Sequence, residues 1–139
     1  MKPGVSISTV LLLLVLTFPA GSHHSFPGTY DVNKSYLLDG VVTKFLFRNP
    51  HSFIFLDVTE EDGTVTTWHL ETVPQWALMR RGIQEDSIVA GDEMLVLCHP
   101  PRDSARTHCG MGAKGGFFRK SDELVFGEDP RLAEDAIKR

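Results

Sequence analysis

The sequence predicts an all-β domain with one short helix, arranged as a five-stranded, OB-fold-like small barrel. Two observations predict this class: a β-hairpin pattern in the middle of the chain, and a single helical segment between the third and fourth predicted strands. Three strands, a helix and two more strands are the order of elements in an OB-fold. A simple sandwich is the main rival, but the lone helix favours the barrel. We place this domain at residues 37–127, as one core in a chain of 139 residues.

The predicted strands follow from alternation and from turn residues. They are residues 37–47, 51–58, 64–71, 93–98 and 124–126. In the second strand Ile54 and Leu56 share one face, and Phe53 and Phe55 share the other. In the third strand Trp68 is expected in the core. The second and third strands are joined by a short acidic turn that ends in glycine, which predicts a hairpin.

The helix is predicted to begin at Thr72. Thr72 is a suitable N-cap, Pro74 would lie in the first turn, and Gln75 has the position that a capping box requires. Trp76 then begins an apolar pattern with helical spacing, so we expect it in the core. Gly82 is a suitable end for this short helix.

Residues 1–22 are predicted to be a signal peptide. Lys2 precedes an aliphatic run at residues 10–16, and small residues follow. Small residues at the last and third-last positions of the removed segment favour cleavage after Ser22, with cleavage after Ala20 as the alternative. The run is shorter than the roughly 20 apolar residues of a spanning helix, so no permanent membrane span is expected. We therefore expect a periplasmic or secreted protein.

The ends of the mature chain and its overall charge limit the classes of function. Residues 23–36 are expected to be an extended arm, and residues 128–139 a polar tail. The formal net charge is −4 and no basic run is present, which argues against nucleic-acid binding. No nucleophile elbow and no phosphate-binding glycine motif occurs, so a non-enzymatic protein is favoured.

Three histidines are the predicted metal ligands. After cleavage, His23 would chelate a metal through its α-amine and ring Nδ1, with His24 beside it. His51 is the natural third ligand, which gives a nitrogen set suited to copper. Cleavage after Ala20 would instead leave Gly21, Ser22 and His23, whose amine, amides and imidazole also suit Cu(II) or Ni(II). The alternative is a solvated arm that binds nothing specific.

Three further residues are candidates for additional ligands or for groups that orient a ligand. His69 and Glu71 share one face of the third strand, so Glu71 could accept a hydrogen bond from a metal-bound histidine or bind the metal directly. Asn49 precedes His51 at the turn. The structural alternatives are a solvent-facing polar pair and a turn stabilised by the asparagine side chain.

Cys98 and Cys109 are predicted to form a disulfide, because the chain is expected to be exported and the loop between them can double back. The alternative is a metal cluster in which His99 and His108 join the two cysteines.

Several motifs together resemble a family of small exported bacterial proteins that is known only as a domain of unknown function. The motifs are His-His-Ser-Phe at residues 23–26, Asn-Pro-His at 49–51, Trp68 with Glu71, and the segment 78–82. The resemblance extends from about His23 to about Leu97, and the loop that holds the cysteines is not part of it. It implies an exported single-domain β-barrel protein and brings no established reaction.

These observations lead to two hypotheses of different classes. The first is an exported, non-enzymatic protein that binds copper through the arm and the hairpin. The second is a metal-free OB-fold module that binds a carbohydrate, a lipid-like molecule or a protein partner through exposed aromatic side chains such as Phe53 or Phe55. Copper-dependent oxidation is a third reading, although nothing in the sequence specifies a substrate groove.

Overall fold

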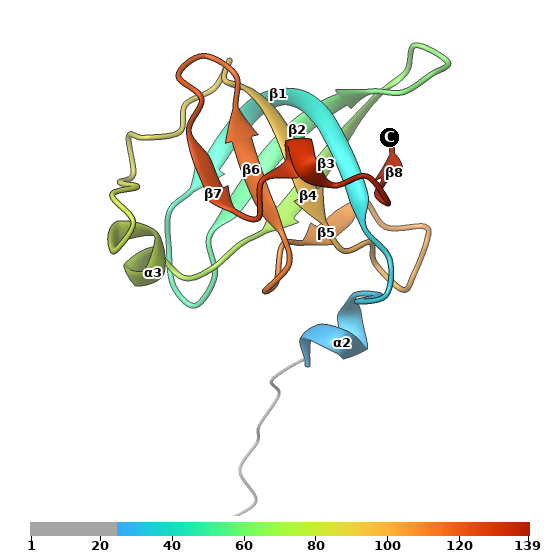
Figure 1. The fold of residues 1–139 in the computed structure, drawn as a ribbon, viewed down its shortest axis with the longest axis horizontal. Helices are drawn as coiled ribbons and strands as arrows, with labels where there is room; N and C mark the ends of the chain where they lie inside the picture. Colours follow the sequence, from blue (N-terminus) through green and yellow to red (C-terminus); the bar gives the residue numbers. More distant parts are fainter. Residues whose placement is uncertain (1–24) are drawn as a thin grey trace, which may run out of the picture.

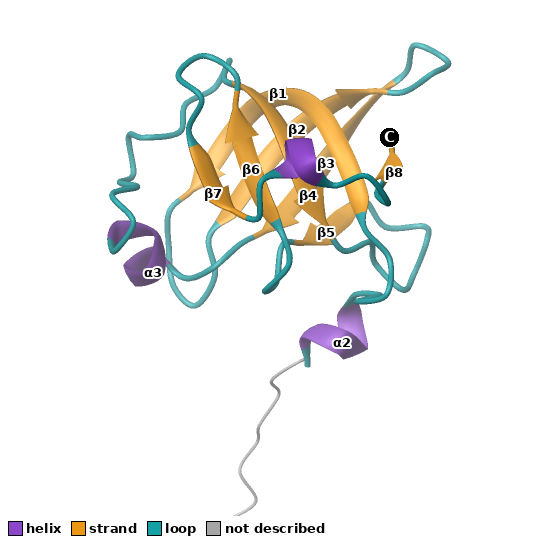
Figure 2. Ribbon diagram, viewed as in Figure 1, coloured by secondary structure: helices purple, strands orange, loops and turns teal. Residues whose placement is uncertain are grey.

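A curled β-sheet forms the body of the protein in the computed structural model, which describes residues 25–139 (Figure 1). The predicted signal peptide, His23 and His24 lie outside the described residues. The strands are β1 Tyr36–Leu46, β2 Phe53–Thr59, β3 Val65–Glu71, β4 Glu93–Cys98, β5 His108–Gly110, β6 Gly116–Arg119, β7 Val125–Gly127 and β8 Ile137–Lys138. The helices are α2 Phe26–Thr29, α3 Gln75–Met79 and a 3-10 turn at Pro130–Leu132. Figure 2 shows how short these helices are beside the strands.

Five strands close into a small barrel. Strands β1, β2 and β3 form an antiparallel meander, β1 also pairs with β4, and β3 pairs in parallel with β5. The ring closes where β5 returns to the end of β4: His99 and Gly110 exchange two backbone hydrogen bonds, of 2.7 and 3.0 Å. The predicted all-β, OB-fold-like barrel is therefore confirmed.

The predicted disulfide lies at this closure. Cys98 and Cys109 are bonded to each other with a Cα–Cα distance of 5.7 Å, and both are buried. Because both sulfurs are used in this bond, the alternative cluster with His99 and His108 is wrong. The bond joins the last residue of β4 to the middle of β5.

The fifth strand of the barrel was predicted at the wrong place. The ring is completed by β5, a three-residue strand in a segment that the sequence predicted to be a loop. The predicted last strand at residues 124–126 instead belongs to a β6–β7 hairpin that pairs with β4 outside the ring. A His-Cys-Gly strand is too short to show alternation, so its sequence gives no strand signal.

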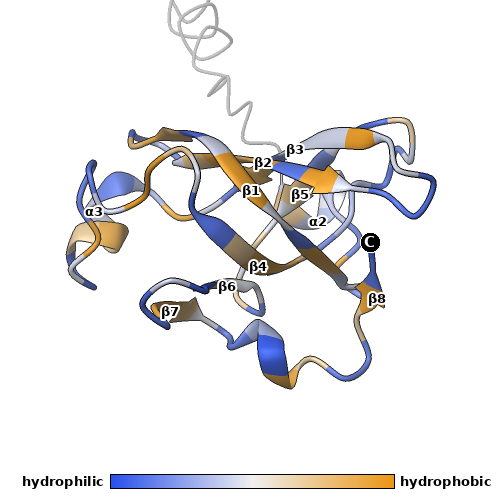
Figure 3. Cartoon of the chain, turned by 90° about the horizontal axis from the view of Figure 1, so that it is seen from above, coloured by the Kyte–Doolittle hydropathy of each residue, from blue (hydrophilic) through white to orange (hydrophobic). Residues whose placement is uncertain are grey.

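The core follows the predicted alternation of the central strands. The inward side chains of β1 to β4 are buried: Leu38, Val42, Ile54, Leu56, Val58, Trp68, Leu70, Met94 and Val96. Figure 3 shows hydrophobic and hydrophilic residues following each other along these strands. The prediction that Trp68 is a core residue is confirmed. The side chains at the outward positions of these strands are therefore not needed for the core.

The predicted start of the helix is wrong. The β2–β3 ladder continues past β3, because Thr72 donates its N–H to the Ser52 carbonyl at 3.0 Å, and Ser52 donates its own to Val73 at 3.2 Å. Thr72 therefore still belongs to the β-ladder, and it is not the N-cap because the helix begins only at Gln75. The N-cap is Pro74, which provides no side-chain hydrogen bond. The predicted end is consistent with the structure, since Gly82 has a φ of 78°.

The prediction that Trp76 packs in the core is also wrong. Trp76 is 56% exposed, and Leu78 is the buried residue of α3. A five-residue helix makes little more than one turn, so it can direct only a narrow face inward. Here that face is Leu78.

The arm has more structure than the sequence predicted. Ser25 caps α2 by accepting a hydrogen bond from Gly28 N–H at 3.1 Å, and Tyr30 is buried. Asp31 N–H donates to the Pro100 carbonyl at 2.9 Å, so the arm pairs with the loop after β4. At the other end of the chain, β8 pairs in parallel with β1. Across residues 25–139, no helix has both the length and the apolar character needed to cross a membrane.

Candidate functional site

A pocket of about 910 Å³ lies between the arm and the closed end of the barrel. We call it the arm pocket. Four segments line it: α2 with Tyr30, the loop from β1 to β2 together with Phe53, the end of β3, and the loop from β4 to β5. These segments are distant in the sequence and meet because β3 and β5 are neighbours in the sheet. Figure 1 shows α2 below this end of the barrel.

A carboxylate at the end of β3 organises the polar side of the arm pocket. One oxygen of Glu71 lies within hydrogen-bond distance of Nδ1 of His51, and its other oxygen accepts a hydrogen bond from the Tyr30 hydroxyl at 2.6 Å. The side chain of Glu71 is 21% exposed and that of His51 is 50% exposed. When Nδ1 of a histidine is bound to a carboxylate, its Nε2 is the atom that remains free to accept a proton or to bind a metal.

Strand register explains why His51 and Glu71 meet. Glu71 is paired with Phe53 across the β2–β3 ladder. His51 is two residues before Phe53, so it lies on the same outer side of the sheet as Phe53 and Glu71. The sequence predicted both residues as candidates, with Glu71 as a possible acceptor of a hydrogen bond from a metal-bound histidine. In the structure Glu71 contacts His51 rather than His69, the histidine two residues before it on β3.

Tyr30 is a site residue that the sequence analysis missed. Burial, followed by the hydrogen bond from its own hydroxyl to Glu71 and the charge of that carboxylate, raises the pKa of Tyr30. Its hydroxyl therefore stays protonated and donates to Glu71. A local signal was present, because Ser25 followed by Pro27 is the pattern of a helix start, which argues against an unstructured arm.

The ring of His69 lies against two other rings instead of joining Glu71. Its centroid is 4.6 Å from that of Phe55 and 4.7 Å from that of His108, which is its register partner on β5. Burial, followed by electrostatic repulsion from the His69 ring and the Arg106 guanidinium when His108 is protonated, lowers the pKa of His108. His108 lines the arm pocket, and its Nδ1 is buried without a hydrogen-bond partner among the described residues.

Asn49 and His99, which the sequence analysis also considered, lie apart from the Glu71 carboxylate. Asn49 is exposed, and it does not line the arm pocket, although its neighbours Pro50 and His51 do. His99 is buried, with its Nδ1 2.8 Å from the carbonyl oxygen of Lys34. His99 thus ties the arm to the barrel through Lys34.

Phe26 seats the arm against the barrel closure. Its ring contacts that of Tyr30, with centroids 4.7 Å apart, and packs over Gly110 and Gly112. A Cβ added at Gly110 would lie 2.6 Å from the Phe26 ring, so the close packing of this ring on the backbone requires glycine at position 110. The residue immediately before the described part of the chain is His24.

The described residues alone do not form a metal centre. Within residues 25–139, no group of three or more histidine, cysteine, aspartate or glutamate side chains is arranged to hold a metal ion. The predicted copper site combines His51 with His23 and His24, which lie outside that range. Among the described residues, the imidazole of His51 is oriented by its contact with Glu71.

The fold and the site define a small barrel with an arm docked over one end. Residues 11–110 match a family of unknown function, DUF6152, and the chain belongs to this family. The matched range confirms the resemblance to a domain of unknown function and extends beyond Leu97 to both cysteines and β5. No curated protein and no solved structure matches the chain.

Proposed function

We propose that this is an exported, non-enzymatic protein that binds copper between its mature N-terminus and the hairpin. The observation that carries the proposal is the pairing of Nδ1 of His51 with Glu71, which is held in turn by Tyr30. Histidines that bind metals commonly donate their second ring nitrogen to a carboxylate, which fixes the tautomer and makes the ligand more basic. His51 is therefore prepared to bind through Nε2.

The other ligands would come from the start of the mature chain. Cleavage after Ser22 makes His23 the N-terminal residue, so its amine and ring Nδ1 form a chelate. With Nε2 of His51 these atoms form the T-shaped nitrogen set that suits copper better than hard cations such as calcium or magnesium. The packing of the Phe26 ring on Gly110 and Gly112 supports this arrangement, because it holds the arm beside the pocket that His51 lines.

The test is a titration of the mature protein, beginning at His23, with Cu(II). We expect one equivalent to bind, and we expect His51→Ala or one added N-terminal residue to remove the high-affinity site. Glu71→Gln should weaken binding about 10-fold to 100-fold, because it removes the charge that orients the ligand. His69→Ala is the matched control, since its ring faces Phe55 and His108.

Unchanged stoichiometry in both the extended protein and His51→Ala would contradict the proposal. Mass spectrometry of the natural N-terminus tests export and the cleavage position together. A chain that begins at Gly21 would bind Cu(II) through residues 21–23 alone. In that case binding would persist in His51→Ala.

The arm pocket favours a second candidate, a metal-free module that binds a carbohydrate, a lipid-like molecule or a protein segment. OB-folds bind ligands on the face of strands 2 and 3 and on the loops after strands 1 and 4. The arm pocket uses those parts here, with Phe53 from the face, Pro50 from one loop and Arg102 from the other. Phe55 is instead covered by His69. Binding to a glycan array in the presence of a chelator, lost in Phe53→Ala, would favour this candidate.

A further inference from the structure

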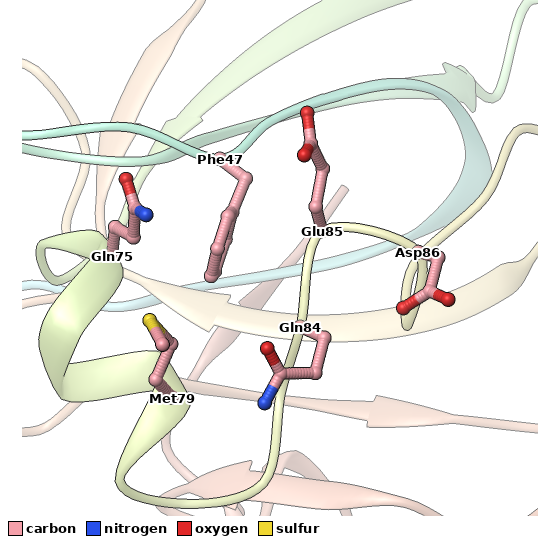
Figure 4. Close-up of a pocket in the computed structure, with 6 residues that line it drawn as sticks. All are labelled: Phe47, Gln75, Met79, Gln84, Glu85 and Asp86. Atoms are coloured by element: carbon pink, nitrogen blue, oxygen red, sulfur yellow. The ribbon is translucent and has the colours of Figure 1, made fainter.

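Helix α3 and the turn after it form an open groove on another part of the surface. The groove has a volume of about 740 Å³ and is lined by Phe47, Gln75, Met79, Gln84, Glu85 and Asp86. We call it the α3 groove. Figure 4 shows the ring of Phe47 and the sulfur of Met79 directed into the hollow, with the two carboxylates on the neighbouring loop. None of these residues lines the arm pocket.

The apolar side of the α3 groove is unusually exposed. Met79 is 46% exposed, and Trp76, three residues earlier on the same face of α3, is 56% exposed. Large apolar side chains that gather on a surface commonly mark a site of interaction. The residues that α3 needs for its own packing do not include these two, since Leu78 is its buried anchor.

The acidic side is held in place by the fold. Ile83 and Ile88 are both buried and fix the two ends of the turn. Within the turn, Gln84 donates its N–H to the Ser87 hydroxyl at 2.8 Å, and Ser87 donates its own to the Gln84 carbonyl at 3.1 Å. The turn therefore presents its side chains from a fixed backbone, which limits the entropy lost on binding.

The charges of the groove are all negative. Glu85 and Asp86 are exposed, and neither forms an ion pair with another of the residues 25–139. The nearest cations along the chain stack on aromatic rings instead. The guanidinium of Arg80 is 5.6 Å from the ring centroid of Trp76, and the guanidinium of Arg81 is 5.0 Å from the ring centroid of Phe126. An apolar floor beside unpaired carboxylates complements an apolar side chain next to a lysine or arginine.

We propose that the α3 groove docks a segment of a partner protein in which a large apolar residue stands beside a lysine or arginine. The apolar residue would lie on Phe47 and Met79, and the cation would face Glu85 and Asp86. Trp76, three residues before Met79 on the same face of α3, would extend the contact. Tryptophan is among the residues most enriched where binding energy is concentrated. The inference is independent of copper and of the arm pocket.

The experiment uses a random dodecamer peptide library displayed on phage, selected against the full mature protein and then synthesised for titration. Trp76 reports binding by fluorescence, because the only other tryptophan, Trp68, is buried. Neutralising the rim with Glu85→Gln and Asp86→Asn should weaken the selected peptides about threefold to tenfold, and Met79→Ala should weaken them as well. Added salt should act in the same direction.

The control replaces two acidic residues at the β2–β3 turn, Glu60→Gln and Glu61→Gln, and should leave the affinity unchanged. The proposal fails if no peptide is enriched. It also fails if the enriched peptides lack basic residues or bind the groove variants as well as the native protein. A dimer in sedimentation that Trp76→Ala abolishes would assign the groove to a second copy of the chain instead.

Discussion

Removing the disulfide tests how much the barrel depends on its closure. The change is the double substitution Cys98→Ala and Cys109→Ala. The two residues are 11 positions apart. On the chain-entropy model, closing a loop of about a dozen residues stabilises the folded state by about 3 kcal/mol, and we expect this amount to be lost. For a small domain that is a large part of the free energy of unfolding.

The structure indicates where this loss acts. Strand β5 has three residues and is held to β3 by a short parallel ladder and to β4 by the single bridge between His99 and Gly110. Without the covalent bond, these few hydrogen bonds must close the ring. Because both sulfurs are buried, their lost packing contacts add to the entropic effect.

The measurement is urea denaturation followed by tryptophan fluorescence. We expect a lower midpoint and a melting temperature reduced by roughly 10–20 °C. The native protein in a reducing agent should approach the variant, and the reducing agent should not affect the variant itself. An unchanged urea midpoint with an unchanged slope would refute the reasoning. So would free thiols in the unreduced native protein, because the bond would then be absent.

Three further predictions concern pH, charge and the arm. The pKa of Tyr30 is raised, so its contribution to stability is complete below its ordinary pKa of about 10 and is lost at higher pH. Tyr30→Phe should remove that loss from thermal melts above pH ~10 and cost about 1–2 kcal/mol at neutral pH. Arg119→Ala should cost about 3 kcal/mol in urea denaturation, because it leaves Asp92, whose side chain is 14% exposed, without its cation at 3.0 Å. Gly110→Ala should displace the Phe26 ring, which limited proteolysis of the arm would detect, whereas an unchanged cleavage rate would contradict this seat.

The central hairpin could be predicted because its information is local. Ile54, Leu56 and Trp68 alternate with outward residues, and a shift of one position would turn the buried face to solvent. The disulfide could also be predicted, from the expected export of the chain and from the length of the loop between the cysteines. Both predictions use residues that are close in the sequence.

The errors arose where long-range pairing decides the local structure. Strand β5 exists because β3 and β4 supply its hydrogen-bond partners, and three residues cannot show this in their own sequence. Thr72 satisfies the pattern of an N-cap, yet its backbone still pairs with Ser52 across the sheet, so the helix begins three residues later, at Gln75. With the start delayed to Gln75, the helix is too short to bury Trp76.

The site shows the same dependence on the assembled fold. Glu71 meets His51 through the register of β2 and β3, and it meets Tyr30 because the arm docks on the loop after β4. One carboxylate thus orients the imidazole and holds the arm. Tyr30→Phe removes only the arm's hydrogen bond, whereas Glu71→Gln alters both contacts. If copper requires the arm and His51 together, both variants should bind it more weakly, with the larger loss in Glu71→Gln. Equal affinity in Tyr30→Phe and the native protein would mean that the docked arm does not contribute to the site.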